Sequence, residues 1–135
     1  MRSACVAGRT QTVSNDPDRL LQILRATCLS EVRSDQPDLT LRQIGIALVV
    51  YQADELQTIR GLAKHLNISK SVVTRALDRL EELELACRTT DARDLRSVLV
   101  QRTAGGAVMV ERLGTVMSKE AKADATTHRT DRSST

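Results

Sequence analysis

The sequence has almost no aromatic side chains, because its 135 residues include no Trp, no Phe and a single Tyr. A fold built from it must have an aliphatic core, and few rings are left on which unpaired bases could stack. This absence argues against the RNA-binding and single-strand-binding modules that depend on aromatic platforms.

Metal ligands and thiols are also scarce, since the chain has only two His and three Cys. Cys5, Cys28 and Cys87 are widely spaced and odd in number, which suits neither a disulfide framework nor a zinc site. His65 and His128 lie far apart, and no Gly-rich phosphate loop follows a strand. We expect no metal, no cofactor and no enzyme activity.

Long apolar runs are absent as well. No stretch approaches the ~18 residues that a membrane-spanning helix needs, and the N-terminus lacks the apolar centre of a signal peptide. We therefore expect a cytoplasmic protein without a membrane segment. The net charge of +3 and the pI near 9.0 permit a polyanionic partner without requiring one. We expect a flexible arm (1–14), one domain (15–118) and a polar, disordered tail (119–135).

What the chain does contain is helical periodicity. Asp16 and Pro17 suit the N-cap and first turn of a helix that ends near Ser34. Thr40 and Gln43 have capping-box spacing for a second helix, which is apolar nearly all round and should lie in the middle of the fold. The apolar stripe of the first helix consists of Leu20, Leu21, Leu24, Cys28 and Val32. The main buried face of the second consists of Ile44, Ala47, Leu48 and Tyr51.

The stretch from Thr58 to Glu84 predicts two helices joined by a tight turn. In the turn, Asn67 tolerates a left-handed backbone, Ile68 can fill the gap and Ser69 can cap the next helix. This is the layout of a helix-turn-helix, whose second helix (70–84) enters the DNA major groove, although an ordinary helical hairpin has the same pattern. The apolar faces are Leu62, Ala63 and Leu66, then Val73, Leu77 and Leu80.

Two short strands, 85–88 and 97–101, flank a polar segment with charges of both signs. They predict a β-hairpin wing directly after the helix-turn-helix. Thr103 can cap a last helix, whose apolar pattern stops near Met117. The expected fold is mainly α with a small β-hairpin wing, a winged helix-turn-helix with flanking N- and C-terminal helices.

The order of these elements and their residues together resemble the MarR family of bacterial winged-helix transcription regulators, from about Leu39 to Leu113. The resemblance implies a homodimer that places two recognition helices in successive major grooves of a pseudo-palindromic operator. The matching motifs are Leu39-Thr40, residues 62–69 (LAKHLNIS), residues 71–81 (SVVTRALDRLE), Asp94-Leu95-Arg96, and Thr103 with Gly106.

Candidate DNA-binding residues come from the recognition helix and the wing. The resemblance places Ser69, Ser71, Thr74 and Arg75 at the major groove, and Arg96, oriented by Asp94, at the minor groove. Lys70, Arg79 and Arg93 are further candidates, which can contact phosphates or remain solvated surface charges. Val72 can contact a thymine methyl or extend the core.

Three departures from the family pattern stand out. Arg102 replaces an apolar residue, so the end of the second strand should be wetter. Gly105 and Gly106 weaken the start of the last helix. The apolar pattern of that helix ends early, which leaves less surface for a dimer.

Sensing and function leave alternatives open. Relatives bind aromatic acids or phenols, but Tyr51 is interpreted as a core residue with its hydroxyl at the surface, and the effector is unknown. Cys28 or Cys87 could have a redox role, and buried Cys more often acts as a small hydrophobe. We expect a sequence-specific double-stranded DNA-binding regulator, most often a repressor. The alternatives are a winged-helix protein-protein adaptor that has lost DNA binding, and a monomeric DNA-binding protein.

Overall fold

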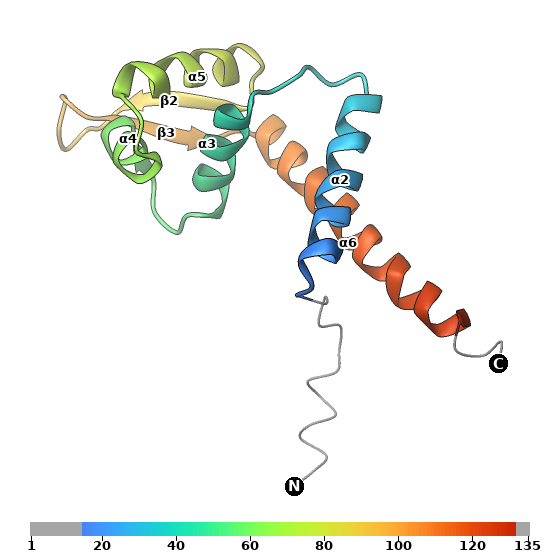
Figure 1. The fold of residues 1–135 in the computed structure, drawn as a ribbon. Coiled ribbons are helices and arrows are strands. Elements are labelled where there is room, and N and C mark those ends of the chain that lie inside the picture. Colours follow the sequence, from blue (N-terminus) through green and yellow to red (C-terminus); the bar gives the residue numbers. More distant parts are fainter. Residues whose placement is uncertain (1–14, 132–135) are drawn as a thin grey trace, which may run out of the picture. The chain divides into compact units, whose positions relative to one another are not determined.

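A computed structural model describes residues 15–131 of the chain, with side chains as far as Ala123. The predicted arm, 1–14, lies outside the described residues. The chain divides into two compact units. One is a winged-helix unit, Pro37–Arg112, and the other is a helical unit formed by the segments on either side of it. The elements are α2 (Pro17–Arg33), α3 (Leu41–Gln52), β1 (Gln57–Thr58), α4 (Ile59–Leu66), α5 (Lys70–Glu82), β2 (Ala86–Thr90), β3 (Val98–Arg102) and α6 (Ala104–Asp131) (Figure 1).

The strands form one antiparallel sheet with the order β1-β3-β2, in which Val100 lies opposite Gln57 on one side and Arg88 on the other. The two predicted strands are present, shifted by about one residue along the chain. The predicted fold class, mainly helical with a small β-wing, is confirmed. β1 was not predicted, because two residues are too short to show an alternating pattern.

The core of the winged-helix unit is aliphatic, as the composition requires. Val73, Leu77 and Leu80 on α5 are buried, as predicted, together with Leu62 and Ala63 on α4. In α3 the deepest residues are instead Ile46, Ala47 and Val50. The expected main face of α3 was therefore wrong in part, since this helix is contacted on more than one side and its face cannot be read from periodicity alone.

Local capping signals fix the helix starts. Thr40 Oγ1 accepts a hydrogen bond from the main-chain N–H of Gln43 at 3.2 Å, and Gln43 Oε1 accepts from Thr40 N–H at 2.9 Å. This confirms the predicted capping box. Asn67 has the left-handed backbone expected at the end of α4, with φ of 55°.

The Tyr51 hydroxyl joins three segments of the winged-helix unit, so its expected surface position was wrong. It donates to the Leu85 carbonyl at 2.8 Å and accepts from the Thr103 N–H at 2.9 Å. A Cβ on Gly106 would lie 1.7 Å from this hydroxyl and 2.2 Å from the Leu85 oxygen. Gly106 is therefore required by the close approach of α6, rather than being only a weak point in the helix.

Arg102, expected to make a strand end wetter, binds the end of α3. Its Nε donates to the Val50 carbonyl at 3.1 Å, and a terminal nitrogen donates to the Ala53 carbonyl. The guanidinium lies 5.9 Å from the centre of the Tyr51 ring. These contacts satisfy carbonyls that the last turn of α3 leaves without helical partners.

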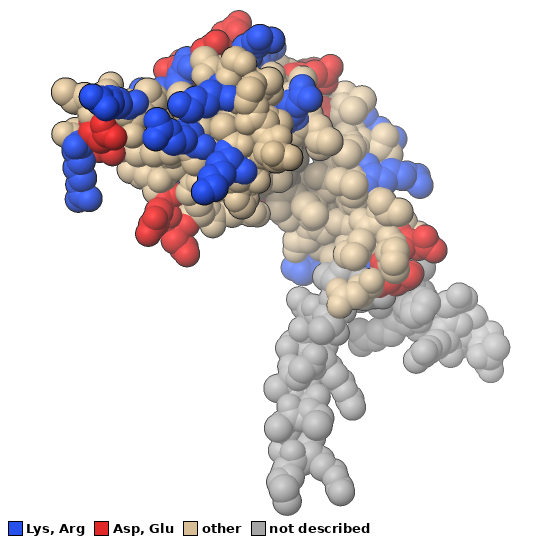
Figure 2. Space-filling view, turned by 60° about the vertical axis from the view of Figure 1, so that its left-hand side comes forward, with Lys and Arg blue, Asp and Glu red and all other residues tan. Residues whose placement is uncertain are grey.

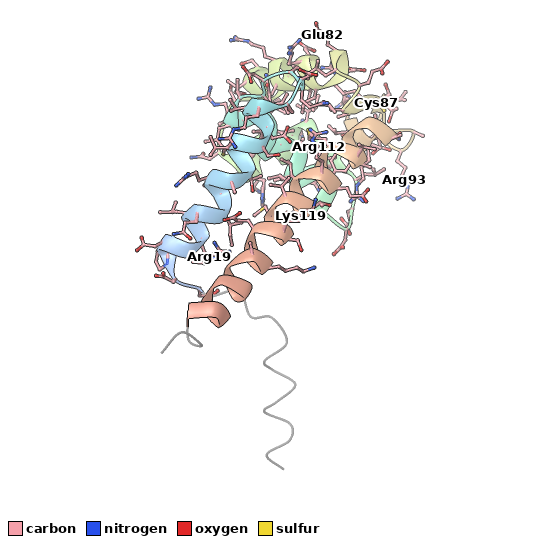
Figure 3. The ribbon with its side chains drawn as sticks, turned by 90° about the vertical axis from the view of Figure 1, so that its right-hand side faces the viewer. Arg19, Glu82, Cys87, Arg93, Arg112 and Lys119 are labelled. Carbon is pink, nitrogen blue, oxygen red and sulfur yellow. The ribbon has the colours of Figure 1, made fainter. Side chains whose placement is uncertain are left out.

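In the helical unit, the buried side of α2 mixes polar and apolar residues and is not the predicted apolar stripe. Arg19 is 7% exposed and donates to the Glu120 carbonyl on α6 (Figure 3). Ile23 and Thr27 continue the buried side at four-residue intervals. The apolar stripe is exposed instead, with Leu20 at 45%, Leu21 at 60%, Leu24 at 53% and Val32 at 72%, and Cys28 is exposed with it.

The last helix is longer than the apolar pattern indicated, since α6 runs to Asp131 rather than ending near Met117. Residues 118–131 contain neither Gly nor Pro and include three Ala, two Lys and one Glu, which favour a helix even without an apolar stripe. No helix in the described part of the chain is long and apolar enough to cross a membrane.

Candidate nucleic-acid interface

The recognition helix α5 presents a polar side opposite its buried residues. Lys70, Ser71 and Arg75 are exposed, and Thr74 is half-buried, whereas Val73 is fully buried. The hydroxyl and guanidinium groups are therefore available at the first two turns, where a recognition helix contacts base edges.

The start of α5 is held by Ser69. Its hydroxyl accepts a hydrogen bond from the Val72 N–H at 3.3 Å and lies 3.0 Å from the Ser71 hydroxyl. Ser69 therefore acts as the predicted N-cap. Val72 is half-buried next to Val73, which keeps part of its methyl surface accessible.

Arg79 lies further along the helix and has a carboxylate neighbour. Its guanidinium forms an ion pair with Glu82 at 3.3 Å, three residues away. Both side chains are substantially exposed, so the pair is weak and can exchange for a phosphate.

The wing loop between β2 and β3 is organised by two aspartates. Asp91 Oδ1 accepts from the Arg93 N–H at 2.9 Å, and Asp94 Oδ1 accepts from the Arg96 N–H at 3.1 Å. Asp94 also accepts from the Ser97 hydroxyl at 3.2 Å. Asp94 thus acts on Arg96 by holding its main chain.

Basic side chains extend over much of this unit. Arg93 and Arg96 are exposed on the wing, and Figure 3 shows Arg93 pointing outward. Arg60 and Lys64 on α4 are exposed too, and sequence reasoning missed them, although they lie opposite the apolar face of that helix. In Figure 2, Lys and Arg side chains crowd the part of the winged-helix unit turned to the viewer, with few carboxylates among them.

A tether between α5 and β2 was also missed. Arg88 on β2 contacts Asp78 at 2.6 Å and Glu81 at 2.7 Å. Burial lowers the pKa of Arg88, but hydrogen bonds to Asp78 and Glu81 outweigh it and raise the pKa above its usual value. The guanidinium stays charged and links the wing to the recognition helix. Two acidic residues three apart on one helix face were the available signal.

We expect Arg88→Met to lower the free energy of unfolding by about 1 kcal/mol at low salt, and by less at high salt, because the three side chains are partly exposed and screened. Urea unfolding at two salt concentrations measures this. Arg79→Met, which removes the exposed pair with Glu82, is the matched control and should cost no more than about 0.5 kcal/mol. Equal losses in the two variants would contradict a special role for the Arg88 tether.

Among residues 15–123, whose side chains the structure describes, no group of His, Cys, Asp and Glu is arranged to hold a metal ion. The candidate interface consists of hydroxyl, guanidinium and ammonium groups on a helix and a neighbouring hairpin. Such a surface can bind a polyanion through charge and can discriminate bases through directed hydrogen bonds.

The helix-turn-helix formed by α4 and α5, followed by the β2–β3 hairpin, defines a winged-helix protein with α5 as its recognition helix. Residues 38–97 match the family model for the MarR family. The match covers the winged helix, and it confirms the resemblance to this family in the motifs. That family consists of transcription regulators and not of enzymes.

Solved structures share the fold. A Staphylococcus aureus MepR–DNA complex is 21% identical, with 85% of this chain and 86% of that chain covered and a TM-score of 0.60. A point mutant of S. aureus MepR bound to an oligodeoxyribonucleotide is 20% identical, with 79% and 76% covered and a TM-score of 0.69. Apo MarR from Escherichia coli is 24% identical, with 82% and 79% covered and a TM-score of 0.60. No curated protein matches the chain.

Proposed function

We propose that this chain is a double-stranded DNA-binding transcription regulator that recognises a specific sequence and represses by occupying it. The observation that carries the proposal is the exposed polar side of α5, with Arg75 at its centre, beside a wing that carries Arg93 and Arg96. The MepR structures with DNA and with an oligodeoxyribonucleotide have the same fold, which supports the choice of ligand.

In this proposal, α5 lies in the major groove. Arg75 pairs with a guanine edge, Ser71 and Thr74 bond to base edges or phosphates, and the accessible part of Val72 contacts a thymine methyl. Ser69 fixes the start of the helix. Its hydroxyl already accepts the capping hydrogen bond from the Val72 N–H, so only its remaining hydrogen-bonding capacity is available to DNA. The flanking cations, Lys70 and Arg79, contact phosphates and set the register.

The wing lies along the minor groove. Arg96 enters the groove or binds its phosphates, because a narrow A·T-rich groove concentrates negative potential. Asp94 and Asp91 hold the loop through main-chain hydrogen bonds, so Arg93 and Arg96 start from a fixed backbone. Less conformational freedom is then lost on binding.

The protein acts as a homodimer in this proposal. The apolar stripe of α2 is exposed to solvent in the single chain. In a dimer the same apolar stripe of a second copy would pack against it and bury both. The length of α6, which extends to Asp131, gives additional surface. A stable interface buries about 1,200–2,000 Å², and two facing copies of the helical unit would contribute to that area.

A salt titration separates DNA binding from the role of a protein adaptor. Binding to a random duplex should fall steeply with rising salt, because each phosphate contact releases a condensed counterion. A surface that only binds proteins should show no such slope. Absence of duplex binding even at low salt would overturn the proposed function.

Leu24→Glu should convert the dimer to a monomer, because the substitution puts a charge on each side of an apolar interface. Light scattering over a range of concentrations measures the mass. Leu24→Met is the matched control, since it keeps volume and apolar character and should leave the dimer intact. A dimer that survives Leu24→Glu would show that the α2 stripe is not the interface.

A further inference from the structure

The tip of the wing carries one apolar residue between the two arginines. Leu95 is 79% exposed, and both Arg93 and Arg96 are exposed on either side of it. In Figure 1 the loop between β2 and β3 projects beyond α4 and α5, and no element of the winged-helix unit covers it. Leu95 therefore contributes nothing visible to the core of that unit.

Single exposed leucines are common, so exposure alone assigns no role. What distinguishes Leu95 is a backbone that is fixed on both sides. Ser97 N–H donates to the Asp94 carbonyl at 2.9 Å, and Asp91 N–H donates to the Ser97 carbonyl at 2.9 Å. Together with the aspartate side-chain bonds at Arg93 and Arg96, these contacts preform the turn that presents Leu95.

We propose that Leu95 is a specificity-determining residue that packs on the floor and sugar walls of the minor groove and disfavours G·C pairs there. The inference rests on the proposed function, because it needs the wing to lie at a duplex. In that proposal Arg93 and Arg96 bind phosphates or enter the groove, and Leu95, which lies between them on the same preformed turn, reaches the groove with them. Burying its side chain there is favourable in proportion to the apolar area covered.

The chemistry of the groove gives the direction of the preference. A·T and T·A pairs offer only acceptors on the minor-groove floor, whereas G·C adds the guanine N2 amino donor. An aliphatic side chain pressed on that amino group removes its water and offers no acceptor, which leaves a buried donor unsatisfied. Arg96 favours a narrow groove through charge, whereas Leu95 acts through this single amino group.

Inosine isolates that group, because an I·C pair lacks the N2 amino of G·C. The probe is a duplex recovered by the wild-type protein from a random pool, with the pairs under the wing set to A·T, G·C or I·C. The wild type should bind the I·C duplex about tenfold more tightly than the G·C duplex, an estimate based on the cost of one unsatisfied donor.

Leu95→Asn is the informative variant, since its side-chain carbonyl can accept from the amino group and its size is similar. It should reduce the I·C to G·C ratio to about twofold or less, by restoring the missing hydrogen bond. Arg96→Ala serves as the control, which should weaken binding to all three duplexes, and most to the A·T duplex, while keeping most of the I·C to G·C ratio. Thermal unfolding of Leu95→Asn should match the wild type, because the side chain is exposed.

An unchanged ratio in Leu95→Asn, or a ratio lost only in Arg96→Ala, would overturn the role of Leu95 while leaving DNA binding in place. Failure of the wild type to bind any of the duplexes would instead overturn the proposed function. The two failures are therefore distinguishable in one set of titrations.

Discussion

Gly106→Ala should lower the free energy of unfolding by about 3 kcal/mol, at the upper end of what overpacking a core costs. The added methyl would lie 1.7 Å from the Tyr51 hydroxyl and 2.2 Å from the Leu85 carbonyl oxygen. One of these atoms is main chain, so a rotamer change of Tyr51 cannot relieve both contacts. Displacing the hydroxyl would also break its bond to the Thr103 N–H.

Urea unfolding followed by circular dichroism measures this loss. Gly45→Ala is the matched control, because Gly45 is also helical and a Cβ there meets nothing within 4 Å. That control should gain about 0.5–1 kcal/mol from the lower flexibility of the unfolded chain. If Gly106→Ala were as stable as Gly45→Ala, the close packing of α6 on Tyr51 would be wrong.

A second variant tests the cause of the loss. Tyr51→Phe removes the hydroxyl, and it should itself cost about 1–3 kcal/mol because Leu85 and Thr103 lose a partner. The two substitutions should be less than additive, since both disturb the same contact.

Arg75→Ala should weaken binding to a duplex selected by the wild type by about 10- to 100-fold, because a bidentate arginine–guanine pair is worth about 1–3 kcal/mol. The residue is exposed on α5 opposite fully buried Val73, so its loss should leave stability unchanged. Binding titrations against the selected duplex and against random duplex measure the difference.

Arg75→Lys is the matched control for charge. It should keep most of the binding to random duplex and lose most of the discrimination, because a lysine retains charge but not the planar pair of donors. Arg96→Ala should weaken binding most on duplexes with A/T-rich flanks. If both alanine variants bound the selected duplex as the wild type does, the assignment of the DNA-binding face would be wrong.

Local signals made much of this fold predictable. The capping box at Thr40, the turn at Asn67 and the buried positions Val73, Leu77 and Leu80 all depend on residues a few places apart. Such contacts leave a periodic trace in the sequence. The wing was predictable for the same reason, as two apolar stretches around a polar loop.

Long-range contacts left no comparable trace. The Tyr51 hydroxyl meets Leu85 and Thr103, which lie 34 and 52 residues away along the chain. The role of Arg102 could not be predicted, because its acceptors are main-chain carbonyls at the end of α3. Every residue has such a carbonyl, so the sequence does not show which of them an arginine will bind. The stripe on α2 was recognisable, but its exposure in the single chain was not, since periodicity does not say whether the same chain or a second copy covers an apolar face.

Selection of bound duplexes from a random pool is the most direct test of DNA recognition by α5 and the wing. We expect enrichment of an inverted repeat whose half-sites are centred about 10 base pairs apart or a multiple of this, because a two-fold dimer places its recognition helices one helical turn apart. Base preference should be strongest within the half-sites and should shift toward A·T beyond them. Recovery of duplexes with no shared sequence, or of none above background, would contradict the account.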